Sequence, residues 1–308
     1  MAKLYILGNG FDLAHGLKTK YSDFGDWLLK KNFEAYILIN FYSIIGVYSE
    51  KLEGNWGNIE NALNLNYEEL EKINDFFSKG SLLSISHQTY FMMSSIFDQI
   101  IRVFKDDFRE WVEEIEKQIN NKKSEIKKIF NFSKDDKFIS FNYTSTLQTV
   151  YEIADANIRQ IHGKISSREN IIFGTEKNNK SNVTNLNSYK HTYTSIFSKE
   201  SKRIATNVID NLLSDWCKNI EEVIIYGCTF GKENGDIEYF KGFCECECLK
   251  GKKIKLIYYC DESNPNDSQD EKDKSELVKS LDKNSKNIKP VSNIEFLSKQ
   301  WTFKFLIF

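Results

Sequence analysis

The chain has 308 residues, with 42 basic against 44 acidic side chains, so its formal net charge is only −2. This near-balance lacks the basic excess by which proteins neutralise nucleic-acid phosphates, so nucleic acid is not an expected partner. Apolar residues make up 41% of the chain and aromatic residues 14%, which excludes wholesale disorder and supplies a large hydrophobic core.

The start of the sequence contains no long apolar segment. Its first apolar run ends at Leu7 and is followed directly by glycine and asparagine, whereas a secretory signal has a longer apolar run. The longest uncharged apolar stretch, 36–48, is shorter than the roughly 20 residues that a membrane-spanning helix needs. We therefore expect a cytoplasmic protein without membrane contact, and a buried helix at 36–48.

The chain contains six cysteines and no export signal, which favours free thiols over a disulfide framework. Cys244, Cys246 and Cys248 alternate with single residues, whereas common zinc pairs have about two to four intervening residues, and no histidine lies nearby. On a helix, Cys244 and Cys248 would share a buried face. A structural role is favoured over a metal site, and no metal is expected.

The first predicted element is a short buried strand at 3–7, which ends in a tight Gly-Asn-Gly turn. A helical pattern follows to about residue 30. From 32 to 130, apolar residues such as Phe104, Phe108 and Trp111 recur at helical spacing with charges between them. This range therefore predicts a helical block.

After residue 136 the pattern changes to short apolar strands that alternate with helices. Strands are expected at 137–141, 158–161, 171–173, 223–226, 254–259, 293–297 and 301–307, and helices at 145–153, 193–216 and 236–249. This alternation predicts an α/β fold with a mostly parallel sheet covered on both faces. The chain is then a single α/β domain, 1–308, with a helical insertion at 32–130; 131–308 completes the core, and 261–290 is a polar segment that holds both prolines.

The glycine turn is the first candidate binding site. A strand followed by Gly8, Asn9, Gly10, Phe11 and Asp12 and then a helix lets backbone amides face a pyrophosphate, although such turns also occur in domains that bind nothing. The dinucleotide fingerprint has a third glycine or alanine where Leu13 stands, and an acidic residue about 20 positions on, where this sequence stays helical. An ordinary nicotinamide dehydrogenase is therefore not expected.

Polar residues also follow three later strands, namely Asn142, the pair His162-Gly163, and the run Gly227, Cys228 and Thr229. Ligands of open parallel sheets bind beyond the carboxyl ends of the strands, so these residues would meet the glycine turn in one crevice. Each has a plainer alternative. Asn142 could cap the following helix, and His162 could be a hydrogen-bonded turn residue. The histidines at 15, 87 and 191 are expected to be structural.

Five segments together resemble the AbiH-like family of bacterial abortive-infection proteins. They are GNGFDLAHGLKTKYSDF at 8–24, WGNIE at 56–60, FNYTSTL at 141–147, IHG at 161–163 and YGCTFGKENGDIEYF at 226–240. The segments occur in the family's order and span almost the whole chain. The resemblance implies a role in antiviral defence.

A more distant similarity is to sirtuins and to sirtuin-like NAD hydrolases of phage defence. Gly8 and Gly10 match the glycines of their first turn, and Gly16 matches another glycine eight positions after the first. Asn142 and His162-Gly163 match a strand-end asparagine and a His-Gly pair. Asp12 replaces a serine, Thr144 replaces an aspartate, and a four-cysteine zinc module is missing from the sequence. The similarity implies a Rossmann-like fold that binds NAD, without protein deacylation.

Cleavage of NAD to ADP-ribose and nicotinamide is the chemistry that this similarity implies. Asn142 would orient a water molecule or a ribose hydroxyl, and His162 would act as the base. The ligand would be held by Gly8, Asn9, Gly10, Phe11, Asp12, Gly163, Gly227 and Thr229, with the amides of 8–11 on the pyrophosphate, Asp12 on ribose or nicotinamide, and Thr229 on the adenosine ribose. Glu60 either reaches the crevice or is a helix-surface carboxylate.

Two other functions stay open at this point. The crevice could sense a nucleotide without turning it over and act through a phage or host protein, or the chain could be a toxin that acts on nucleic acid. The sequence does not decide whether the protein is an enzyme, what triggers it, or whether it forms a homo-oligomer.

Overall fold

The computed structural model describes residues 2–45, 56, 59, 88–165, 171, 213, 216, 219–228, 239, 243, 249, 251–258 and 288–292. The chain divides into two compact units. The sheet unit comprises Met1–Lys18, Ile115–Ile172 and Glu200–Phe308, and the helical unit comprises Thr19–Glu114 and Phe173–Lys199. The expected insertion at 32–130 overlaps the helical unit from 32 to 114.

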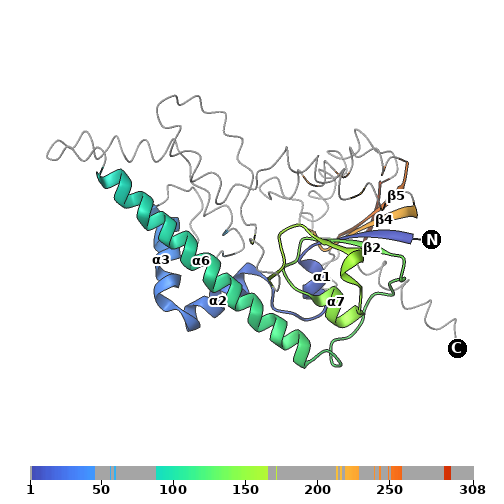
Figure 1. Cartoon of the computed structure of the whole chain (residues 1–308), viewed down its shortest axis with the longest axis horizontal. Helices are drawn as coiled ribbons and strands as arrows, with labels where there is room; N and C mark the ends of the chain where they lie inside the picture. The colour runs from blue at the N-terminus through green and yellow to red at the C-terminus, as the bar shows by residue number, and fades with distance from the viewer. Residues whose placement is uncertain are drawn as a thin grey trace, which may run out of the picture. The chain divides into compact units, whose positions relative to one another are not determined.

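Six strands are found among the described residues of the sheet unit. They are β1 (Ala2–Leu7), β2 (Lys137–Ser140), β3 (Ile158–Gln160), β4 (Ile220–Tyr226), β5 (Lys253–Tyr258) and β6 (Ile288–Ser292). Their order is β3-β2-β1-β4-β5-β6, and each strand is parallel to its neighbours. This is the strand order of the Rossmann dinucleotide-binding fold. The predicted α/β, Rossmann-like fold is therefore confirmed (Figure 1).

The described helices are α1 (Gly10–Ala14), α2 (Tyr21–Lys31), α3 (Phe33–Ile45), α6 (Gln88–Asn121) and α7 (Thr146–Tyr151), with a short 3-10 turn at Asp155–Asn157. α1 and α7 belong to the sheet unit, and α2 and α3 to the helical unit. α6 belongs to the helical unit up to Glu114 and to the sheet unit from Ile115. None of these described helices is long and apolar enough to cross a membrane.

β1 has an almost continuous apolar sequence because both of its faces are covered. Leu4 and Ile6 pack into the core on one face of the sheet. Tyr5 and Leu7 pack into the core on the other face, together with side chains of α1 and α7. Burying each such aliphatic side chain stabilises the fold by roughly 1.5–3 kcal/mol. Coverage of both faces is typical of a parallel sheet.

β6 overlaps the end of the polar segment 261–290, whereas the sequence predicts the next strand only at 293–297. The strand begins at Ile288 and contains Pro290, which lies opposite Leu256 of β5. β6 is the last strand of the described sheet. Proline lacks a backbone N–H and is accommodated at a sheet edge, where one side of the strand is unpaired. The strands predicted at 293–297 and 301–307 lie outside the described residues.

The helical pattern predicted from the glycine turn to about residue 30 forms two helices instead of one. Gly16 has a φ of +75°, a left-handed conformation that ends a helix just after α1. α2 then starts after Lys20, whose backbone N–H donates to the Asp23 carboxylate at 2.9 Å. The border between the sheet unit and the helical unit, at Lys18, lies in this break.

The helical unit has an aromatic core centred on Phe24. The ring centroid of Phe24 lies 5.3 Å from those of Phe108 and Trp111, and 5.9 Å from that of Trp56. A Cβ on Gly25 would lie 2.6 Å from the indole of Trp56, which explains the glycine inside α2. The helical spacing of the aromatic residues in 104–111 is therefore confirmed as a buried face of α6.

Other predicted elements fall wholly or partly outside the described residues. Ile171 is buried but not in a strand, and 172–173 are not described. Only single residues of the predicted helices at 193–216 and 236–249 are described, and the cysteine run at 244–248 is not among them. The Sγ of Cys228 lies 3.6 Å from the carbonyl oxygen of Tyr226. The predicted helix at 36–48 corresponds to α3 as far as Ile45.

Candidate functional site

Gly8 and Gly10 lie directly against the loop that follows β4. The N–H of Gly8 donates to the carbonyl of Tyr226 at 2.9 Å, and the N–H of Gly10 donates to that of Gly227 at 2.8 Å. A Cβ on Gly10 would lie 2.5 Å from the Cα of Gly227, and a Cβ on Gly8 would lie 2.5 Å from the Gly227 carbonyl oxygen. Close packing between the backbone of the turn after β1 and that of the loop after β4 therefore explains why both positions are glycine.

This packing engages amides that the sequence assigns to a pyrophosphate. Besides the N–H groups of Gly8 and Gly10, that of Phe11 donates to the Gly8 carbonyl at 2.9 Å. The Phe11 side chain is buried in the sheet core, whereas Asn9 is exposed. A phosphate near this turn would need donors other than these three amides.

Asp12 of α1 is only 1% exposed. Its two carboxylate oxygens accept hydrogen bonds from the hydroxyls of Thr144 at 2.6 Å and Thr146 at 2.7 Å. Burial raises the pKa of Asp12 from 3.8 to about 6; the two threonine hydroxyls oppose this shift, and the negative charge of Glu116 adds to it. In this position the carboxylate holds α1 to the loop after β2 and acts as a positioning residue for that loop.

Glu116 of α6 holds the same loop from another side. It accepts hydrogen bonds from both the backbone N–H and the hydroxyl of Ser145, the N-cap residue of α7. The Ser145 hydroxyl also lies 3.1 Å from that of Thr149. Sequence reasoning missed Glu116 and Ser145. The three consecutive residues with side-chain hydroxyls at 144–146 are the sequence feature that indicates a hydrogen-bonded loop.

Asn142 follows β2 and is 5% exposed. Its N–H donates to the Ser140 hydroxyl at 3.1 Å, and its carbonyl accepts from the Gln160 side chain at 3.2 Å. The capping alternative does not apply, because the N-cap of α7 is Ser145. Within the described part of the chain, the hydrogen bonds of Asn142 use its backbone and leave its side-chain amide for another partner. Gln160, which also bonds the Thr144 carbonyl at 3.1 Å, is a further residue that sequence reasoning missed.

His162 follows β3 and is 4% exposed. Its ring centroid lies 5.3 Å from that of Phe141, 5.7 Å from that of Tyr143 and 6.5 Å from that of Tyr239. Gly163 is also buried and has a φ of +86°, so the chain turns sharply after the histidine. Because β2 and β3 are neighbours, His162 and Asn142 lie at the same edge of the sheet.

His15 occupies a structural position, as its place in the first helical segment predicts. Its Nδ1 lies 2.7 Å from the Phe11 carbonyl and its Nε2 lies 2.6 Å from the Tyr151 hydroxyl. That hydroxyl already accepts the N–H groups of Ile129 at 3.0 Å and Phe130 at 3.2 Å, so its own proton points to Nε2. Nδ1–H then donates to Phe11. Burial lowers the pKa of His15, which agrees with this neutral form.

The structure thus brings Asn142, His162 and the 144–146 loop to the carboxyl edge of β2 and β3, and brings Gly227 to the glycine turn. Thr229 and Glu60, and the histidines at 87 and 191, lie outside the described residues.

Comparison with known proteins shows that the residues at this edge lie in a part of the chain that matches one protein family. The family model for bacteriophage abortive infection AbiH matches residues 4–258, which include β1 from Leu4 onward, the strands β2 to β5 and the strand-end residues. No curated protein and no solved structure matches the chain. The similarity to sirtuins therefore stays a prediction.

Proposed function

The chain belongs to the bacteriophage abortive infection AbiH family, and we propose that it acts in this anti-phage defence by binding NAD at the carboxyl edge of its sheet and cleaving it to ADP-ribose and nicotinamide. The observation that carries the proposal is the placement of Asn142 and His162 at the ends of neighbouring strands in a sheet with the Rossmann strand order. Both side chains are nearly buried, which suits chemistry that must exclude bulk water.

In the proposed reaction the bond between nicotinamide and C1′ of the ribose breaks, and the electron pair leaves with nicotinamide. Water adds to C1′, so NAD and water give ADP-ribose, nicotinamide and one proton. The side-chain amide of Asn142 orients the water or a ribose hydroxyl, and His162 takes the proton. The aromatic rings around His162 limit its access to other water molecules.

The glycine turn offers few free hydrogen-bond donors to the pyrophosphate of NAD. Since the amides of Gly8, Gly10 and Phe11 already bond within the chain, we assign the phosphate contacts to the exposed Asn9 and to the loops at Gly163 and Gly227. Thr229, which lies outside the described residues, remains our proposed contact of the adenosine ribose.

Incubation of the purified protein with NAD, followed by chromatography of nicotinamide, tests the reaction. Release should fall by at least about a hundredfold in His162→Ala, as expected for loss of a general base, and also in Asn142→Ala. Asn131→Ala is the matched control, because Asn131 is an exposed asparagine of the same unit. Release that is equal in all four proteins would remove both residues from the mechanism.

A measurement in infected bacteria covers the case in which a phage component must first activate the protein. Cellular NAD should fall after infection in cells that express the wild type, and should stay constant in cells that express His162→Ala. Constant NAD in both, with defence intact in the wild type, rejects NAD cleavage. Degraded RNA or DNA in cells with constant NAD would point to a nucleic-acid toxin instead.

A non-catalytic sensor that acts through a protein partner is the second candidate. Three large apolar side chains of the helical unit are exposed, Leu29 by 41%, Phe33 by 59% and Ile37 by 48%. Phe33 and Ile37 are four residues apart on α3 and so share one face of the helix, and exposed apolar residues that share a face are typical of contact regions. Calorimetry that detects NAD binding without product, together with loss of defence in Phe33→Ser, would favour this function over hydrolysis.

A further inference from the structure

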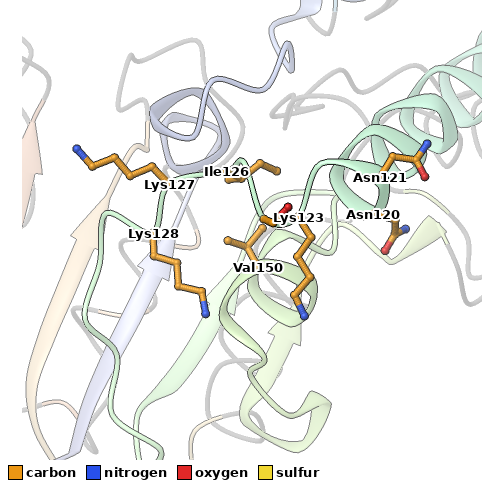
Figure 2. Close-up of a pocket in the computed structure, with 8 residues that line it drawn as sticks. Asn120, Asn121, Lys123, Ile126, Lys127, Lys128 and Val150 are labelled. Carbon is orange, nitrogen blue, oxygen red and sulfur yellow. The ribbon is translucent and has the colours of Figure 1, made fainter.

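A cavity of about 560 Å³ that is widely open to solvent lies at the surface of the sheet unit, and none of its lining residues belongs to the strand-end site. It is formed by the end of α6, the segment after it and one residue of α7 (Figure 2). The lining residues are Asn120, Asn121, Lys123, Ser124, Ile126, Lys127, Lys128 and Val150. Its volume falls within the range of sites for small molecules, roughly 300–1,000 Å³.

A hydrogen-bonded turn at the end of α6 shapes this cavity. The N–H of Lys122 donates to the Gln118 carbonyl at 2.9 Å, and the N–H groups of Glu125 and Ile126 donate to the Lys122 carbonyl at 2.8 and 3.1 Å. These bonds fold the chain back on itself directly after the helix. Lysines on both sides of the turn therefore line the same cavity.

The charge around the cavity is strongly positive. From Lys117 to Lys128 the chain has five lysines and one glutamate. Lysines that directly follow a helix complement the negative end of its dipole, which accounts for Lys122 and Lys123 but not for lysines beyond the turn. In Figure 2, the side chains of Lys123 and Lys128 extend toward the same side of the cavity, on either side of Val150.

One carboxylate faces these two lysines. Glu152 accepts a hydrogen bond from Lys123 at 2.8 Å, and Lys123 and then Lys128 lower the pKa of Glu152. The side chains of this pair are 45% and 67% exposed, and such exposed ion pairs are weak. A multiply charged anion can therefore compete with Glu152 for Lys123.

We propose that this cavity binds a small organic phosphate, with Lys123 and Lys128 on its phosphate groups. Lysine is a common point-charge partner of phosphate. Asn121 and Ser124 supply neutral hydrogen-bonding groups, while the half-buried Ile126 offers an apolar surface that a bare inorganic ion would not use. The site is separate from the proposed NAD site and is placed to bind an effector.

Calorimetric titration of the purified full-length protein with ADP tests the proposal. In Lys123→Gln/Lys128→Gln the dissociation constant of the cavity site should rise at least about tenfold, because two charge-assisted hydrogen bonds to the phosphate groups are lost. Lys122→Gln removes the same kind of charge next to Lys123 but outside the cavity lining, and should change the constant by less than about twofold. Higher salt should weaken wild-type binding.

His162→Ala separates this site from the proposed NAD site. ADP binding that depends on the two lysines and survives in His162→Ala supports the proposal, whether or not the protein cleaves NAD. Binding that is lost in His162→Ala and unchanged in the double lysine variant places ADP at the strand ends and overturns it. Equal weakening by Lys122→Gln shows diffuse attraction and also overturns it, as does the absence of ADP binding to the wild type at millimolar concentration.

Discussion

The hydroxyl of Thr144 donates a hydrogen bond of 2.6 Å to the carboxylate of Asp12, a residue 132 positions earlier in the chain. Thr146 donates to the other carboxylate oxygen at 2.7 Å, and the Thr144 and Thr146 hydroxyls lie 3.1 Å from each other. This cluster joins the helix after β1 to the loop after β2. It therefore fixes the loop that carries Asn142 relative to the glycine turn.

Asp12→Asn should remove the contribution of Asp12 to the pH dependence of the protein's stability. The folded pKa of about 6 exceeds the unfolded value of 3.8, so the folded state binds the proton more tightly. The resulting stabilisation is complete below the unfolded pKa and is lost as the pH rises through about 6. A shift of about two pKa units corresponds to about 3 kcal/mol. We expect the free energy of unfolding of Asp12→Asn to rise by up to that amount, relative to that of the wild type, as the pH increases from about 4 to about 7.

Urea unfolding of both proteins across this range provides the measurement. The difference between them isolates Asp12, because every other titratable group is the same in both proteins. Asp135→Asn is a suitable control, since Asp135 is exposed in the same unit. A difference between Asp12→Asn and wild type that stays constant with pH would contradict the role assigned to burial.

Gly10→Ala should destabilise the sheet unit by about 3 kcal/mol, the upper part of the range for overpacking. The added Cβ would lie 2.5 Å from the Cα of Gly227, where backbone cannot give way. Gly16→Ala is the control, because its Cβ would meet nothing within 4 Å and the cost comes from its φ of +75°. That cost is about 1–2 kcal/mol. Denaturant unfolding should rank Gly10→Ala as the less stable variant; the reverse order would show that the two loops do not pack closely.

Much of the sheet was predictable because buried parallel strands are short apolar runs that end at turn residues. β1, β2 and β4 all have this pattern, and each lies within a few residues of its predicted range. β6 was missed because an edge strand carries little of the apolar signal and tolerates Pro290. The break between α1 and α2 was missed because a single glycine, Gly16, ends the helix within an otherwise helical pattern.

The candidate site was only partly predictable for a different reason. Strand ends identify Asn142 and His162, since parallel topology brings such residues to one edge. The partners of Asp12 depend on contacts between residues more than a hundred positions apart, which no local pattern encodes. The glycine turn has a local pattern of phosphate binding, yet its glycines are required by contact with Gly227, a feature that only the tertiary structure reveals.

Glu116→Gln should loosen the loop at Ser145. The carboxylate accepts two hydrogen bonds from Ser145, and a glutamine amide has only one acceptor oxygen. We expect a loss of about 1–3 kcal/mol in the free energy of unfolding. Glu113→Gln, an exposed position on the same helix, should cost less than about 0.5 kcal/mol. Equal values for the two variants in denaturant unfolding would show that the Ser145 contact contributes nothing.

Tyr151→Phe tests the hydrogen bonds that surround His15. Removal of the hydroxyl leaves the N–H groups of Ile129 and Phe130 and the Nε2 of His15 without the partner that they share. Unsatisfied groups of this kind cost about 1–3 kcal/mol each, so we expect a loss of at least about 2 kcal/mol in thermal or denaturant unfolding. Tyr36→Phe is the control, because Tyr36 packs by its ring on Trp56. If both variants unfold like the wild type, water replaces the Tyr151 hydroxyl and that hydroxyl contributes nothing to stability.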